Sequence, residues 1–210
     1  MADVLVKICG ICRFEDGLLA ARLGASLLGF VLADSPRRID RAGAAVIVDR
    51  LRQELGDRAP RMVAVVVSPA LHEVADLTVS GGFDMVQVHG VLPAGLGISG
   101  LAWYGTVHPG LVAGTDMVDG DRFGAFLSTD DPVWKSPLRL LLVDAAVAGK
   151  HGGTGRRVDP VFAGQVLAHA RSRGLGMLLA GGLSPKNVGA ALAAVAPDGV
   201  DVASGVEESP

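Results

Sequence analysis

The sequence predicts an α/β protein, a (β/α)8 barrel, and three observations favour this fold class. Eight short aliphatic runs recur along the 210 residues. Several of them, such as residues 62–67 and 140–143, are continuously apolar, which is typical of parallel strands buried on both faces. Between the runs stand three helix-start signals, each a capping side chain followed by proline. A doubly wound open sheet is the alternative that counting strands leaves open.

The elements follow one another in regular order along the chain. The expected strands are residues 4–8, 26–31, 62–67, 85–88, 101–106, 138–143, 176–179 and 199–202. The helix-start signals are Ser68-Pro69, Asp159-Pro160 and Ser184-Pro185, and apolar residues at helical spacing follow each. Proline suits the first helical position because its missing N–H would have no partner there.

We expect residues 1–210 to form one barrel domain, since such barrels take about 250 residues and rarely fewer than about 200. Residues 91–137 are rich in Gly, Asp and Pro with weak periodicity, so this region is predicted to be irregular. The sequence ends at Pro210, eight residues after the last expected strand. We therefore expect the barrel to lack a full eighth helix.

Composition limits the function classes. The net charge of −3, without a basic stripe, argues against nucleic acid as a partner. No apolar run approaches the roughly 18–20 residues of a membrane span, and no signal peptide is visible. The 29 glycines are nearly double the average usage of about 7%, yet the chain is too apolar for disorder. We expect a cytoplasmic globular protein that does not act at a membrane.

Cys9 and Cys12 form a C-x-x-C motif. A redox role would need this pair at the start of a helix in a thioredoxin-like fold, and one such motif is a weak signal. Structural zinc would need about four ligands, and the chain has no other cysteine. We therefore expect neither a metal nor a redox cofactor.

The candidate site follows from the rule that barrel enzymes act at the carboxyl ends of their strands. Polar or glycine residues follow six of the expected strands: Cys9, Arg37, Gln87 with His89, Asp144, Gly181-Gly182 and Ser204-Gly205. Glycine N–H groups after the last two strands are a typical phosphate site. Each residue also has a structural explanation: Cys9 as a small buried side chain, Asp144 as a cap, Arg37 as a solvated charge, His89 as a rim residue and the glycines as tight turns.

With these residues in view, the chain resembles phosphoribosylanthranilate isomerase of tryptophan biosynthesis. Six motifs carry the resemblance, in the family's order and spacing. They are residues 6–11 (VKICGI), 35–37 (SPR), 86–90 (VQVHG), 142–144 (LVD) with 152–155 (GGTG), 179–188 (LAGGLSPKNV) and 199–207 (GVDVASGVE). Residues 91–137 match poorly.

The resemblance implies an Amadori rearrangement of N-(5-phosphoribosyl)anthranilate to an aminoketose, without a cofactor. Asp144 would be the acid and Cys9 the base, and Arg37 would bind the anthranilate carboxylate. Gly181, Gly182, Ser204 and Gly205 would bind the phosphate, and Gln87, His89, Gly153 and Gly155 the rest of the substrate. The expected partner is a small phosphosugar, and the expected state a monomer or homodimer. Another phosphosugar enzyme on this fold, or a binding barrel without turnover, is the alternative.

Overall fold

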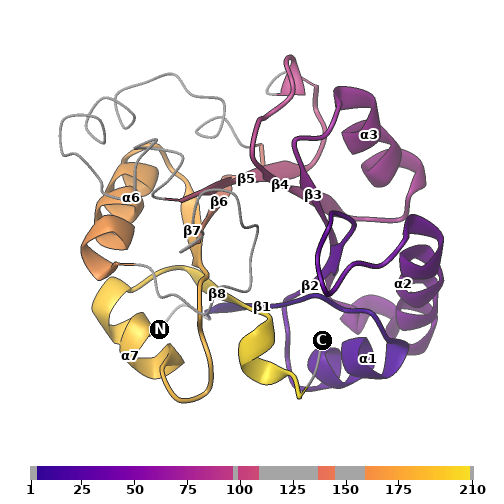
Figure 1. The fold of residues 1–210 in the computed structure, drawn as a ribbon, viewed down its shortest axis with the longest axis horizontal. Helices are drawn as coiled ribbons and strands as arrows, with labels where there is room; N and C mark the ends of the chain where they lie inside the picture. The colour runs from indigo at the N-terminus through magenta and orange to yellow at the C-terminus, as the bar shows by residue number, and fades with distance from the viewer. Residues whose placement is uncertain (1–3, 97–98, 109–136, 145–158, 209–210) are drawn as a thin grey trace.

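Eight parallel strands close into a barrel in the computed structural model, which describes residues 4–96, 99–108, 137–144 and 159–208 (Figure 1). The strands pair in chain order, and β8 returns to β1. They are β1 (Leu5–Cys9), β2 (Leu27–Val31), β3 (Arg61–Val67), β4 (Met85–His89), β5 (Trp103–Val107), β6 (Leu140–Val143), β7 (Gly176–Leu179) and β8 (Gly199–Val202). The predicted fold class is confirmed, and closure excludes the open sheet.

Burial on both faces explains the unbroken apolar runs. In β3, Val63 and Val65 belong to the cluster that fills the barrel, together with Tyr104 and Leu142. The intervening Met62 and Ala64 belong to the cluster between barrel and helices. Since neither face meets water, the strand has no polar alternation.

Helices surround the ring of strands (Figure 1): α1 (Phe14–Arg22), α2 (Arg41–Leu55), α3 (Leu71–Ala75), α6 (Pro160–Ser172) and α7 (Val188–Val195). The Asp159-Pro160 signal is confirmed, because the Asp159 carboxylate accepts from Val161 N–H at 3.0 Å and Pro160 is the first residue of α6. The other two signals lie outside the helices that follow them.

The Ser68-Pro69 prediction is wrong by two residues, because α3 begins at Leu71. Ser68 has φ +46°, and its Oγ accepts a hydrogen bond from Val91 N–H at 3.0 Å instead of capping a helix. The Glu73 carboxylate accepts from Ala70 N–H at 2.6 Å, at the position preceding the helix. The serine therefore ties two loops together.

The Ser184-Pro185 prediction is wrong by three residues, because α7 begins at Val188. These residues form a turn instead, in which Asn187 Oδ1 accepts from Ser184 N–H at 2.8 Å. Asn187 Nδ2 also donates to the Gly182 carbonyl at 2.8 Å. The asparagine thus fixes the loop after β7 ahead of the helix.

The region predicted to be irregular, 91–137, contains the regular strand β5. The described part of the connection from β4 to β5 consists of turns without an α-helix, while residues 109–136 lie outside the described residues. After β8, residues 203–208 contain only the three-residue 3-10 helix η5 (Ser204–Val206), so within them there is no full eighth helix. In the described part of the chain, no helix is long and apolar enough to span a membrane.

Candidate active site

A pocket opens at the carboxyl ends of the strands and gathers the residues singled out in the sequence. Its lining includes Cys9, Arg37, Gln87, His89, Asp144, Gly181, Gly182, Ser204 and Gly205. These residues come from strands spread around the whole ring, so barrel closure is what assembles them. Gly153 and Gly155, also predicted for the site, lie outside the described residues.

Cys9 ends β1 beside a buried ion pair. Lys7, two residues earlier, points to the same side of the strand and lies inside the barrel with 0% exposure. Its Nζ lies 2.8 Å from Asp201 Oδ1 on β8, the neighbouring strand. A Cβ on Gly29 would lie 2.8 Å from Cys9 Sγ and 3.1 Å from Lys7 Nζ, so the absence of that atom leaves room for both groups.

Opposing effects set the protonation of this thiol. Burial raises the pKa of Cys9 above its usual value, and the Asp201 carboxylate acts in the same direction, while the Lys7 ammonium lowers it. The pKa of Lys7 is raised despite its burial, because Asp201 and Cys9 favour its charged form. The lysine therefore remains a cation next to the thiol.

Gln87 and His89 belong to a short polar chain along the barrel interior. The Tyr104 hydroxyl donates to Gln87 Oε1 at 2.9 Å, and Gln87 Nε2 lies 2.7 Å from His89 Nε2. Burial raises the pKa of Tyr104, which keeps its proton available for donation. With Oε1 engaged as an acceptor, the amide nitrogen donates to the imidazole, so that ring nitrogen accepts.

Glycine is required after β7 and after β8 for different structural reasons. Gly181 and Gly182 have φ values of +89° and +59°, a region that side chains disfavour. A Cβ on Gly205 would overlap the Leu183 carbonyl, so glycine lets the two loops touch. Among the described residues we find no acceptor for the N–H groups of Gly182, Ser204 and Gly205. Three N–H groups at one end of the pocket suit an anion.

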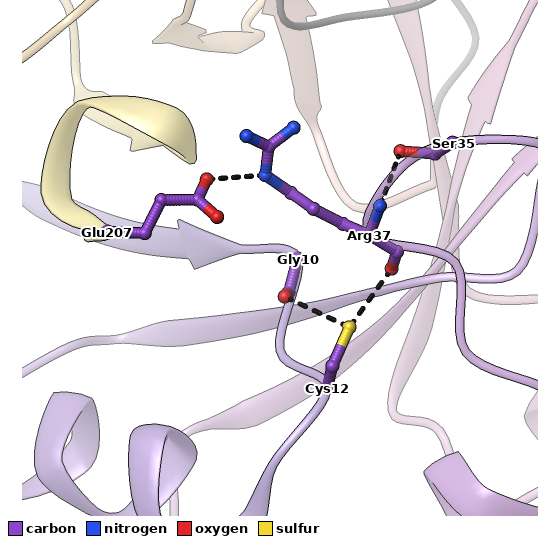
Figure 2. A network of polar contacts seen from close by, with 5 residues as sticks. All are labelled: Gly10, Cys12, Ser35, Arg37 and Glu207. Carbon is purple, nitrogen blue, oxygen red and sulfur yellow. Dashed lines mark hydrogen bonds and ion pairs between the residues drawn. The ribbon is translucent and has the colours of Figure 1, made fainter. Parts of the chain in front are cut away.

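Arg37 lies at the rim and is held by residues of three loops (Figure 2). Its Nε pairs with the Glu207 carboxylate, so it is not a solvated surface charge. Asp144 follows β6, and its N–H donates to the Val107 carbonyl at 3.0 Å, which continues the barrel ladder and places the residue at the pocket. No group of three metal-ligating side chains occurs among the described residues.

Cys9 and Cys12 serve different parts of the structure, although they form a C-x-x-C motif. Both are free thiols. Cys9 Sγ neighbours Lys7 inside the barrel, whereas Cys12 Sγ lies 3.2 Å from the Arg37 carbonyl. The motif therefore combines a pocket thiol with a loop-fixing thiol.

Comparison with known proteins identifies the family. The family described as N-(5'-phosphoribosyl)anthranilate (PRA) isomerase matches residues 6–209. The chain belongs to the PRA isomerase family. A curated PRA isomerase of Geobacter sp. (strain M21) is 37% identical over 206 residues, covering 98% of this chain and 89% of the relative. The resemblance seen in the sequence is thereby confirmed.

Solved PRA isomerases have the same barrel. The Thermotoga maritima enzyme superposes with a TM-score of 0.75 at 28% identity, covering 99% of this chain and 91% of that one. A phosphoribosyl anthranilate isomerase in complex with reduced 1-(o-carboxyphenylamino)-1-deoxyribulose 5-phosphate superposes with a TM-score of 0.72 at 27% identity, with the same coverage. That ligand is a phosphosugar bearing an aromatic carboxylate.

Four residues at or next to the pocket residues were not singled out in the sequence. Tyr104, Gly29 and Glu207 each lie against a predicted residue from another strand or loop, and Asp201 pairs with Lys7, which lies beside Cys9. Asp201 and Glu207 lie within the motif at residues 199–207, which carries part of the family resemblance. Their charge beside the predicted phosphate loop is a signal that could have identified them. Nothing in the sequence around Tyr104 or Gly29 marks either residue as part of a site.

Proposed function

We propose that Asp144 and Cys9 are the acid and base with which this isomerase converts N-(5'-phosphoribosyl)anthranilate into its aminoketose. The chain is an isomerase of the aldose–ketose type that acts in tryptophan biosynthesis. Asp144 protonates the ring oxygen as the C1–O bond breaks, which leaves an iminium at C1. Cys9 then removes the C2 proton, which gives the enaminol. The enaminol takes up a proton at C1 and loses the proton of its C2 hydroxyl to become the ketone. No net oxidant is needed, since C1 is reduced as C2 is oxidised.

The observation that carries this proposal is that both residues line one pocket. Cys9 ends β1 and Asp144 follows β6, and β7 and β8 stand between these strands. A sugar anchored at the loops after β7 and β8 therefore lies between a thiol and a carboxyl group. Acid and base on opposite flanks of one substrate is the arrangement that the two proton transfers require.

The base role of Cys9 needs a thiolate. Burial opposes ionisation, and the Lys7 ammonium favours it. Lys7 in turn depends on Asp201, which holds its Nζ at 2.8 Å. We therefore assign the fully buried Lys7 to stabilisation of the thiolate, an electrostatic role.

The remaining pocket residues position the substrate. The N–H groups of Gly182, Ser204 and Gly205, with Gly181 shaping the loop, bind the phosphate. Arg37 binds the aromatic carboxylate, and Gln87 and His89 contact the sugar. The cytoplasmic location and the monomeric or homodimeric state remain predictions for this chain, and the Thermotoga maritima relative is described as dimeric.

Turnover of the wild-type protein tests the proposed function. N-(5'-phosphoribosyl)anthranilate is mixed with the enzyme and the loss of its anthranilate fluorescence is followed. We expect saturable turnover that inorganic phosphate inhibits. A protein that binds the substrate without converting it would instead be a phosphosugar-binding barrel, the alternative left open by the sequence.

A further inference from the structure

Arg37 is held at three points at the rim of the pocket. Its N–H donates to Ser35 Oγ at 3.1 Å, its carbonyl lies 3.2 Å from Cys12 Sγ, and its Nε pairs with the Glu207 carboxylate (Figure 2). Its side chain is 11% exposed and that of Glu207 is 23% exposed. Because the pair is partly shielded from water, salt screens it less than an exposed surface pair.

The aliphatic part of Arg37 is fixed as well. It lies across Gly10, where an added Cβ would come within 2.5 Å of Arg37 Cδ. Gly10 has φ +93°, so both the space and the backbone conformation favour glycine at this position. The β1 loop thereby provides a surface on which the arginine side chain lies.

Cys12 fixes the backbone of the arginine. Burial raises the pKa of the Cys12 thiol, and the Glu207 carboxylate acts in the same direction. The group therefore remains protonated at neutral pH and directs its S–H toward the carbonyls of Arg37 and Gly10, at 3.2 and 3.5 Å. The second cysteine of the C-x-x-C motif thus holds the backbone of Arg37.

The ion pair leaves one end of the guanidinium available. Glu207 occupies Nε, and among the described residues neither terminal nitrogen has a protein partner. In Figure 2 these two nitrogens extend beyond the ion pair. Two parallel N–H groups at the end of a guanidinium match the two oxygens of a planar carboxylate.

We propose that Glu207 is a positioning residue that commits Arg37 to end-on binding of the substrate's aromatic carboxylate. This inference rests on the proposed function and deepens it, since it assigns the preference for a carboxylated aromatic amine to the Arg37–Glu207 pair. Glu207 does not compete with the substrate, because it binds the Nε side and not the end. Without Glu207, the guanidinium gains rotamers that point away from the carboxylate, and binding loses its geometric selectivity.

Two probes and three variants test the assignment by calorimetry. The probes are reduced 1-(o-carboxyphenylamino)-1-deoxyribulose 5-phosphate and the same compound without the ring carboxylate. Glu207→Ala should weaken binding of the first probe about tenfold or more and leave the second within about twofold. Glu207→Gln, whose amide oxygen accepts the same Nε bond, should restore most of the affinity. Glu208→Ala is the matched control, because Glu208 is exposed and makes no described contact.

Each other outcome decides against the inference. Unchanged or tighter binding of the carboxylated probe by Glu207→Ala would show that the pair is dispensable or competes with substrate. Equal losses for both probes would show a merely structural role. Wild-type protein that binds neither probe, or binds the first without any turnover of substrate, would overturn the proposed function itself. Normal wild-type turnover with an unaffected Glu207→Ala variant would overturn only the positioning role.

Discussion

Lys7 and Asp201 form an ion pair inside the barrel, with 2.8 Å between Nζ and Oδ1, and Cys9 lies beside the lysine. Lys7 is fully buried, and Asp201 retains 11% exposure. A buried pair of this kind is weak support for stability, because desolvation offsets the attraction. Its position next to the pocket thiol is instead the basis of the role proposed for Lys7.

Lys7→Met should make the Cys9 thiol harder to ionise. The ammonium lowers the pKa of this thiol, whereas burial and Asp201 raise it, so its loss moves the pKa further up. Below that pKa the base is a thiol, so the acidic limb of kcat/KM should shift to higher pH. Alkylation of Cys9 by iodoacetamide at pH 8, followed by mass spectrometry, should slow about tenfold or more.

The exposed Lys186→Met is the control for this change, and its alkylation profile should match the wild type. The single variant leaves the Asp201 carboxylate buried without its partner, which could damage the fold. The double variant Lys7→Met with Asp201→Asn removes both charges and therefore controls for this effect. If Lys7→Met alkylates at the wild-type rate across the pH range, the lysine does not stabilise the thiolate.

Gly29→Ala should displace the Cys9 thiol. Its Cβ would lie 2.8 Å from Cys9 Sγ, closer than real Cβ atoms approach such a neighbour, and at a tight 3.2 Å from Cys9 Cα. We expect kcat to fall at least about tenfold, since a shift near 1 Å in a reacting group is costly. Gly164→Ala in α6, where a Cβ meets nothing within 4 Å, should leave kcat unchanged. Wild-type turnover in Gly29→Ala would show that the thiol position is not critical.

Gly205→Ala should weaken phosphate binding. The methyl group would overlap the Leu183 carbonyl, which is backbone and cannot turn aside, so the loops after β7 and β8 must separate. We expect KM and the inhibition constant of inorganic phosphate to rise together, with kcat less affected. Gly189→Ala in α7, whose Cβ would meet nothing within 4 Å, is the control. Unaltered phosphate inhibition in Gly205→Ala would place the phosphate elsewhere.

Much of the barrel could be predicted from the sequence because parallel strands buried on both faces have a strong local signature. β7 and β8 lie where the apolar runs placed them, and the other strands differ by no more than two residues at either end. The site residues could be listed because they lie at the carboxyl ends of strands or in the loops after them, and barrel closure brings these ends together.

What could not be predicted depends on contacts between distant residues. A strand that is apolar on both faces does not reveal which face is interior, so the inward direction of Lys7 and its partner Asp201 stayed open. Ser68 stands where a helix cap is expected, yet its hydroxyl accepts a hydrogen bond from Val91 N–H in another loop. Arg37 and Glu207 stand 170 residues apart, and only the closed ring makes them neighbours.

The central claim is that Cys9 and Asp144 transfer protons to and from a sugar held by other groups. The most direct test compares kcat with the dissociation constant of the reduced aminoketose phosphate in Cys9→Ser and Asp144→Asn. We predict that kcat falls by about 10²–10⁴ in each variant, while the dissociation constant stays within about threefold of the wild-type value. A wild-type kcat in either variant, or a loss of turnover matched by an equal loss of binding, would contradict the assignment.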